Sequence, residues 1–243
     1  MKRKSPVSAL SARKSVSAFT LVELLVVIAI IVILMSLLLT AVPAVKKAAG
    51  KAEARNTCNM VVTALNAYYT EYAKFPPTDT AAPAPGTPVL DVVVGSTSGI
   101  PNNTVFYTLR NIAKGPNEEY AANPRKVTFY EGKAAKPGAG GTARNGFYDH
   151  DKSGGIPGAM QESCLYDPWG QQYGVVLDLT GDDRIDLVGY YADYTGVDDS
   201  GKAPRRKAGA FSTGEDEVLG SKDKMGYYRS ANETSDDVVS WDQ

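Results

Sequence analysis

The sequence has one histidine and two cysteines among 243 residues. His150 lies between aspartates in a glycine-rich stretch, and no Gly-x-Ser-x-Gly nucleophile motif accompanies it. The two cysteines, Cys58 and Cys164, lack the paired spacing of zinc-binding motifs. These absences argue against an enzyme, and we expect no catalytic residue.

The chain also lacks an excess of positive charge, with 26 Lys and Arg against 27 Asp and Glu. Residues 1–18 hold five basic residues and no acid, which leaves 21 basic against 27 acidic residues in the rest. Phosphate binding needs clustered Lys and Arg, so no nucleic-acid partner is expected. A basic head before an apolar segment stays on the cytoplasmic side of a membrane.

No charged residue occurs in the 22 residues from Leu24 to Val45. A helix of this length spans about 33 Å, close to the thickness of a bilayer's hydrocarbon core. The small residues Ser17 and Ala18 precede the run, whereas in a secretory signal they follow it. A charged side chain in a membrane helix usually has a partner. Processing after Ala18 would free an amine on Phe19 that could neutralise Glu23 of a neighbouring subunit.

The stretch AFTLVELLVVIAIIVIL, from Ala18 to Leu34, resembles the processing and methylation segment of type IV prepilins and of type II secretion pseudopilins. The resemblance implies that a prepilin peptidase removes the leader, residues 1–18, by cutting between Ala18 and Phe19. It also implies N-methylation of Phe19 and a role for Glu23 in assembly. The chain departs from the family at Ala18, where glycine is usual.

The helix is expected to continue well beyond the membrane. Apolar residues recur with helical spacing at Cys58, Val62, Leu65, Tyr69 and Tyr72. Pro76 and Pro77 end this pattern, and Pro43 predicts a kink or a locally melted turn. The sequence therefore predicts a helix over residues 19–75, of which 19–45 form the transmembrane part.

Residues 76–243 are predicted to form a globular periplasmic domain. Strands are expected at 89–94, 126–130, 172–179, 186–191 and 207–212, with a short helix at 105–113 and a flexible loop at 132–146. A long helix followed by antiparallel strands predicts an α+β fold in which the helix lies across a small sheet. This is also the type IV pilin fold that the resemblance implies.

A turn is predicted at Asp167-Pro168-Trp169-Gly170, because proline presets one backbone angle and glycine accepts an unusual one. With Tyr173, it resembles the DPWG turn of G-type major pseudopilins of type II secretion systems. We interpret it as a tight turn in which Trp169 is a packing anchor.

Two C-terminal stretches, FSTGEDEVLG and SDDVVSW, resemble the terminal loop of G-type pseudopilins, which closes around one calcium ion. The resemblance implies Ca²⁺ as a cofactor, with Asp216, Asp236 and Asp237 as carboxylate ligands. The intervening loop, 220–235, is longer than is usual in that family. Two other acidic loops, 149–160 and 178–186, lack a glutamate at the twelfth position and are interpreted as solvated turns.

The two cysteines leave an alternative open. In an oxidising compartment Cys58 and Cys164 could form a disulfide, but buried free cysteines are also common.

The resemblance predicts a structural subunit of a type II secretion pseudopilus, a homo-oligomeric helical filament. Its expected partners are the prepilin peptidase, minor pseudopilins and the assembly platform of the bacterial inner membrane, which the chain would cross once. One alternative is a type IV pilus pilin for adhesion, motility or DNA uptake, although neither cysteine lies near the C-terminus. Another is a membrane-anchored, pilin-like surface binding protein, although no histidine follows His150.

Overall fold

The computed structural model describes residues 19–78, 91–96, 98–138, 141–149, 160–185, 204–217 and 236–241. The chain divides into two compact units, residues 1–46 and residues 47–243. One helix, α1 (Leu21–Tyr72), contributes its first half to the first unit and its second half to the second unit.

The first half of α1 is apolar on every side. The large apolar side chains from Phe19 to Val45 are exposed. Among the described residues this is the one helix long and apolar enough to cross a membrane. Pro43 lies inside α1, which continues through it, so the predicted local melting is absent. Proline removes one backbone hydrogen bond, and the neighbouring turns keep theirs.

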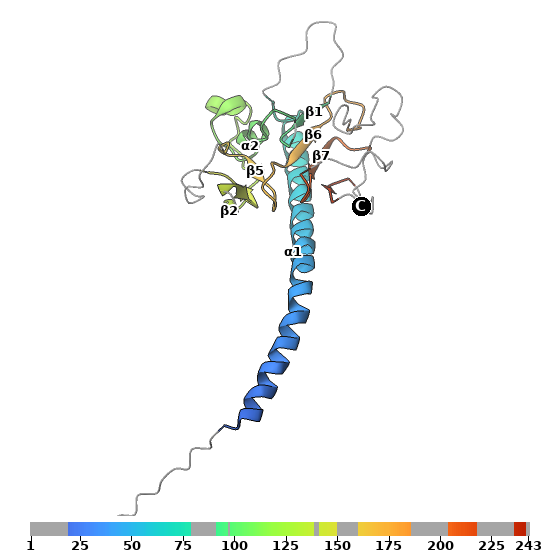
Figure 1. The fold of residues 1–243 in the computed structure, drawn as a ribbon. Helices are drawn as coiled ribbons and strands as arrows, with labels where there is room; N and C mark the ends of the chain where they lie inside the picture. Colours follow the sequence, from blue (N-terminus) through green and yellow to red (C-terminus); the bar gives the residue numbers. More distant parts are fainter. Residues whose placement is uncertain are drawn as a thin grey trace, which may run out of the picture. The chain divides into compact units, whose positions relative to one another are not determined.

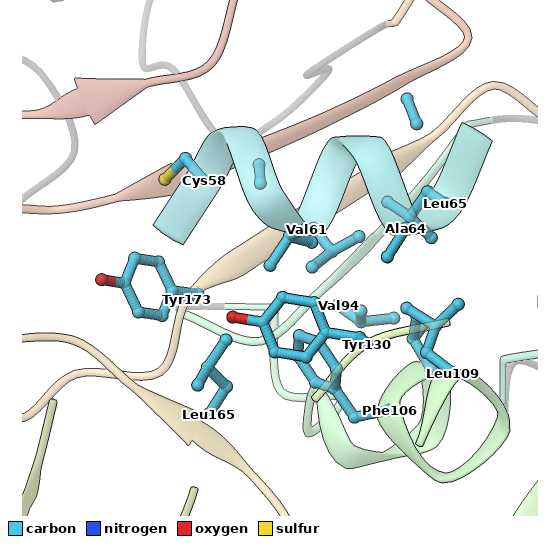
Figure 2. Close-up of a cluster of buried hydrophobic side chains, with 14 of the residues drawn as sticks. Cys58, Val61, Ala64, Leu65, Val94, Phe106, Leu109, Tyr130, Leu165 and Tyr173 are labelled. Carbon is cyan, nitrogen blue, oxygen red and sulfur yellow. The ribbon is translucent and has the colours of Figure 1, made fainter. Parts of the chain in front are cut away.

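The second half of α1 supplies one wall of the main hydrophobic core. In Figure 2, Cys58, Val61 and Leu65 of α1 lie close to side chains from the surrounding strands, loops and α2. The buried partners include Val94, Phe106, Leu109, Tyr130, Leu165, Tyr173, Val175 and Leu177. Burying a side chain of the size of Leu or Val contributes about 1.5–3 kcal/mol, so this face of α1 holds the unit together.

The buried face of α1 differs slightly from the predicted one. Val61 and Tyr68 are fully buried, whereas Val62, Tyr69 and Tyr72 are partly exposed at its edge. The predicted face is therefore confirmed, because Cys58 and Leu65 are fully buried and the other three residues pack against the same core. The centre of the buried face lies at Val61 and Tyr68, which the sequence alone did not show.

The core is completed by a four-stranded antiparallel sheet in the order β1-β6-β7-β8. Its strands are β1 (Val92–Val94), β6 (Gly174–Leu177), β7 (Ala208–Ser212) and β8 (Val238–Val239). The helical segments between β1 and β6 are α2 (Asn103–Leu109) and the 3-10 segment η1 (Gly115–Tyr120). Two short pairs complete the described strands: β2 (Lys136–Pro137) with β3 (Ala143–Arg144), and β4 (Gly146–Phe147) with β5 (Leu165–Tyr166). The α+β fold with a long helix on a small antiparallel sheet is confirmed.

Two predicted segments are wrong. No strand forms at 126–130, where the N–H groups of Phe129 and Tyr130 both donate to the Leu109 carbonyl, at 2.8 and 3.1 Å. This segment therefore closes the end of α2 instead of joining a sheet. The expected loop at 132–146 contains the pair β2–β3 and the first residue of β4. The strand expected at 186–191 lies outside the described residues.

A buried amide ties α2 to the sheet region. Asn102, at the start of α2, donates from Nδ2 to the carbonyls of Leu165 and Tyr173, both at 2.9 Å. Its Oδ1 accepts the N–H of Leu165 at 3.0 Å. The side chain has no solvent exposure. Its amide forms the hydrogen bonds that the backbone of a neighbouring strand would otherwise form with these groups.

We expect Asn102→Ala to lower the free energy of unfolding by about 3 kcal/mol, because it removes three hydrogen bonds to buried backbone groups. The neighbouring Asn103→Ala is the control, since Asn103 donates at the surface to the Glu162 carbonyl and to the Tyr107 hydroxyl. Chemical unfolding of the two variants measures the difference. Equal losses would contradict the anchoring role of Asn102.

Candidate functional site

The predicted assembly residue, Glu23, lies in the first turn of α1 and is bound by Thr20. The Thr20 N–H and hydroxyl both donate to Oε2 of Glu23 at 2.8 Å, and the Glu23 N–H donates to the Thr20 hydroxyl at 3.2 Å. This reciprocal pattern is a capping box. The spacing Thr-x-x-Glu is a sequence signal for such a cap, and the sequence reasoning missed it. The cap turns the carboxylate towards the N-terminal end of α1.

The structure describes only one of the two residues at the predicted processing site. Phe19 is 76 % exposed, and Ala18 lies outside the described residues. Cleavage between Ala18 and Phe19, methylation of Phe19 and the assembly role of Glu23 therefore stay predictions.

The predicted turn at 167–170 is confirmed, and one carboxylate holds it. Oδ1 of Asp167 accepts the N–H groups of Trp169, Gly170 and Gln171, at 2.9, 2.7 and 2.9 Å. Its Oδ2 accepts the hydroxyl of Ser212, on β7, at 2.6 Å. Asp167 therefore closes the turn and fastens it to the sheet.

The turn also contacts α1, as the anchoring role of Trp169 requires. A Cβ atom added to Gly50 of α1 would lie 3.2 Å from the Trp169 ring, so the ring packs directly on this glycine. Tyr173, the last residue of the motif, is buried in the main core. The motif is structural, and it connects α1 to β7.

Burial changes the pKa of the Asp167 carboxyl. Desolvation raises the pKa of this carboxyl above its ordinary value of 3.8, although the Ser212 hydroxyl and the three backbone N–H groups act in the opposite direction. A raised pKa in the folded state means that the contribution to stability is complete below about pH 4 and declines as the pH rises through the folded-state pKa.

A second group of acidic residues lies where β7 ends and β8 begins. The exposed turn after β7 carries Glu215 and Asp216, while Asp236 and Asp237 before β8 are 7 % and 5 % exposed. The Glu215 N–H donates to Oδ2 of Asp236 at 2.6 Å. Gly214 has φ +74°, and a Cβ there would lie 2.6 Å from Cγ of Asp236. Only glycine allows this approach.

The structure brings the calcium ligands that the resemblance implies only partly together. Within the described ranges, no three side chains of His, Cys, Asp or Glu come together to hold a metal ion, so Asp216 is not grouped with Asp236 and Asp237. The Thr213 hydroxyl is buried without a hydrogen-bond partner among the described residues. The β7–β8 register, which pairs Ser212 with Val238, places Thr213 next to Asp237. Oxygen donors of this kind fit a hard cation.

The acidic turn also reaches the second half of α1. Lys47 forms an ion pair with Glu215 at 2.9 Å. Glu215, with Asp236 and Asp216 at longer range, raises the pKa of Lys47 above its ordinary value. Both side chains are about half exposed, so solvent screens the pair and it adds little stability.

The cysteines are free and buried, and the disulfide left open by the sequence is not formed. The Cys58 thiol is directed at the Val238 carbonyl, 4.0 Å away, and the Cys164 thiol at the Gln161 side chain, 3.7 Å away. They belong to separate hydrophobic clusters. Burial raises the pKa of the Cys164 thiol to about 12 and also raises the pKa of Cys58, so both thiols are protonated at neutral pH.

The other acidic loops differ from each other. Asp149 forms a bidentate ion pair with Arg110, at 3.1 and 2.7 Å, and is not a solvated turn residue. The Arg110 guanidinium also stacks 3.9 Å from the centroid of the Phe147 ring, a contact that sequence spacing could not reveal. Asp178 accepts backbone N–H groups of its own loop, as expected of a turn. His150 lies outside the described residues.

We expect Asp167→Ala to lower the free energy of unfolding by about 3–5 kcal/mol, because three backbone donors lose their shared acceptor. Asp167→Asn keeps an acceptor for these donors, so its loss should be smaller. Since asparagine does not titrate, the stability advantage of the native protein over Asp167→Asn should decrease as the pH rises above about 4. Urea unfolding at several pH values measures both effects. An advantage that grows with pH would contradict the raised pKa.

Comparison with known proteins adds one finding. Residues 13–39 match the family model described as the prokaryotic N-terminal methylation motif. No curated protein and no solved structure matched the chain. The matched residues include the predicted cleavage site, the capping box of Thr20 and Glu23, and much of the apolar half of α1. The match supports a prepilin-type protein, and together with the apolar half of α1 it indicates anchoring in a membrane.

Proposed function

We propose that the chain is a G-type pseudopilin, a structural subunit of a type II secretion pseudopilus. The observation that carries the proposal is the methylation motif at 13–39, followed by an apolar helix that runs into a small α+β unit. The motif by itself implies processing by a prepilin peptidase and filament assembly. The turn at 167–170, which joins α1 to the sheet, supports the secretion subfamily.

In this function the chain is cut after Ala18 and crosses the inner membrane once, with its second unit in the periplasm. Subunits leave the bilayer when the apolar halves of their helices pack together, because helix packing then replaces contacts with lipid. The Glu23 carboxylate of an entering subunit forms an ion pair with the positively charged, methylated Phe19 amine of its neighbour. The minor pseudopilins and the assembly platform of the inner membrane are the expected partners. We assign no catalytic step to the chain.

The capping box gives Glu23 a partner before assembly. An uncompensated carboxylate near a bilayer is costly, and the Thr20 hydroxyl and N–H reduce this cost in the free subunit. A neighbouring amine would offer a full positive charge in place of these neutral donors. Assembly is then favoured by an exchange of partners at Glu23.

The proposal predicts that the mature protein begins at Phe19 with a methylated amine, as mass spectrometry of material from the native host would show. Glu23→Ala should leave processing intact and reduce the yield of sheared filaments at least tenfold. Ser36→Ala is the control, because the Ser36 hydroxyl donates to the Ile33 carbonyl of its own helix, at 2.7 Å. A mature chain that starts at Met1, or normal filaments from Glu23→Ala, would refute the proposal.

The same motif also occurs in type IV pilins, so the system must be tested separately. Deletion of the gene should stop the export of folded proteins and leave surface pili and pilus-dependent motility unchanged. Loss of motility with normal export would instead assign the chain to a type IV pilus.

We also propose that the β7–β8 end binds Ca²⁺ through Asp236 and Asp237, with Asp216 of the facing turn. Asp236 and Asp237 are adjacent buried carboxylates, and the buried Thr213 hydroxyl supplies a further oxygen of the kind that Ca²⁺ prefers. When bound, the ion would clamp the C-terminal segment to β7, so its role would be structural.

Calcium should therefore raise the thermal unfolding temperature of the native chain, and a chelator should reverse the rise. Asp237→Asn should lose most of this shift. Glu217→Gln is the control, because Glu217 is exposed and is not among the proposed ligands. An unfolding temperature that calcium does not change would refute the site.

A further inference from the structure

All four basic residues of α1 lie within ten residues after its apolar half. They are Lys46, Lys47, Lys51 and Arg55, although the chain from residue 19 onwards has fewer basic than acidic residues. At a rise of about 1.5 Å per residue, Lys51 lies about 9 Å beyond Val45 along the helix axis. The polar headgroup region is about 5–8 Å thick on each side of a bilayer's hydrocarbon core. A helix inserted up to Val45 therefore brings these basic residues to the level of the lipid phosphates.

Helix geometry directs these side chains back towards the bilayer. In an α-helix every Cα–Cβ bond tilts towards the N-terminus, which is the apolar end of α1. The long side chains of Lys and Arg reach a polar interface over several ångströms. Lys47, Lys51 and Arg55 recur at every fourth position, so they share one side of the helix. Like charges at this spacing repel each other, and an anion bound beside them removes the repulsion.

The second unit neutralises only part of this charge. Lys47 forms an ion pair with Glu215, but no ion pair in the described part of the chain includes Lys51 or Arg55. The Arg55 side chain is exposed, and Lys51 is partly exposed. Both side chains are therefore available to an anion from outside the protein.

The one acidic residue in this stretch of α1, Glu53, has partners of its own. It forms an ion pair with Lys133, and Nδ2 of Asn145 donates to its Oε2 at 2.5 Å. Burial raises the pKa of Glu53, but these two partners and the nearby Lys136 outweigh burial and hold the pKa below its ordinary value. Figure 1 shows β2, which contains Lys136, on one side of α1 and β7 on the other. Glu53 is thus neutralised from the β2 side and leaves the other basic side chains of α1 uncompensated.

We propose that Lys51 and Arg55 bind the headgroup phosphate of an anionic phospholipid, on the side of the membrane that holds the second unit. A guanidinium pairs with two phosphate oxygens, and an ammonium adds a point charge. Each basic residue next to a membrane helix contributes about a fivefold preference for anionic lipid. In the proposed filament, a subunit must release this lipid before it leaves the bilayer. The site itself rests on anchoring by α1 and not on the secretion function.

Lipid retention by the full chain tests the site. The chain is purified in a neutral detergent and mixed with equal amounts of phosphatidylglycerol and phosphatidylcholine, and native mass spectrometry measures how much of each lipid stays bound. The native chain should prefer phosphatidylglycerol, and the double variant Lys51→Gln, Arg55→Gln should reduce this preference at least tenfold. The double variant Lys74→Gln, Arg205→Gln is the matched control, because both residues are exposed and lie outside α1. Equal retention of the two lipids by the native chain, or an unchanged preference in the first double variant, would overturn the proposal.

A charge-conserving exchange separates lipid binding from folding. The double variant Lys51→Arg, Arg55→Lys keeps both charges and should keep most of the preference for phosphatidylglycerol. Neither side chain forms an ion pair with a described residue, so both this variant and the glutamine variant should unfold at the temperature of the native chain. If the charge-conserving variant loses the preference as fully as the glutamine variant, the site is not electrostatic and the proposal is wrong.

Chemical labelling of lysines locates the contact in vesicles. Lys51 should react several-fold more slowly with a neutral amine reagent when the bilayer contains phosphatidylglycerol than when it contains phosphatidylcholine alone. Lys74 lies beyond the far end of α1, about 30 Å from Lys51 along the helix axis, and the screening length is about 10 Å at 0.1 M salt. Its rate should therefore not change, and equal protection of the two lysines, or no protection of Lys51, would overturn the site. Because the vesicles contain no filaments, that result leaves the proposed function intact, whereas normal filaments from Glu23→Ala would refute the proposed function and not this site.

Discussion

The contact between the second half of α1 and the sheet is the interaction on which the second unit depends. Val61, Leu65 and Tyr68 are fully buried there, and α2 and the turn at 167–170 are positioned against the same helix. The four sheet strands are two to five residues long, so the sheet alone offers little apolar surface. A long helix supplies the missing wall of the core.

Buried polar side chains fix the positions of loops that the short strands do not fix. Asp167 collects three backbone N–H groups and a β7 hydroxyl, and Asn102 replaces strand hydrogen bonds at the start of α2. Such groups are costly unless all of their hydrogen bonds are formed. They therefore select one arrangement of loops that apolar packing alone would leave undetermined.

The same helix meets two environments with different surfaces. Up to Val45 it is apolar on all sides, as a lipid-facing or bundled helix must be, and further along it is apolar on one face only. At its start, the capping box gives the carboxylate of Glu23 a local partner. In the proposed filament function, this division lets one element serve as anchor, assembly surface and core.

The sequence by itself determined the membrane-length helix, the turn at 167–170 and the α+β class, because each depends on local spacing or on local backbone preference. It did not determine the centre of the buried face of α1, the role of 126–130 in closing α2, or the pairing of Arg110 with Asp149. These depend on residues brought together from distant parts of the chain, and only the tertiary structure fixes such neighbours.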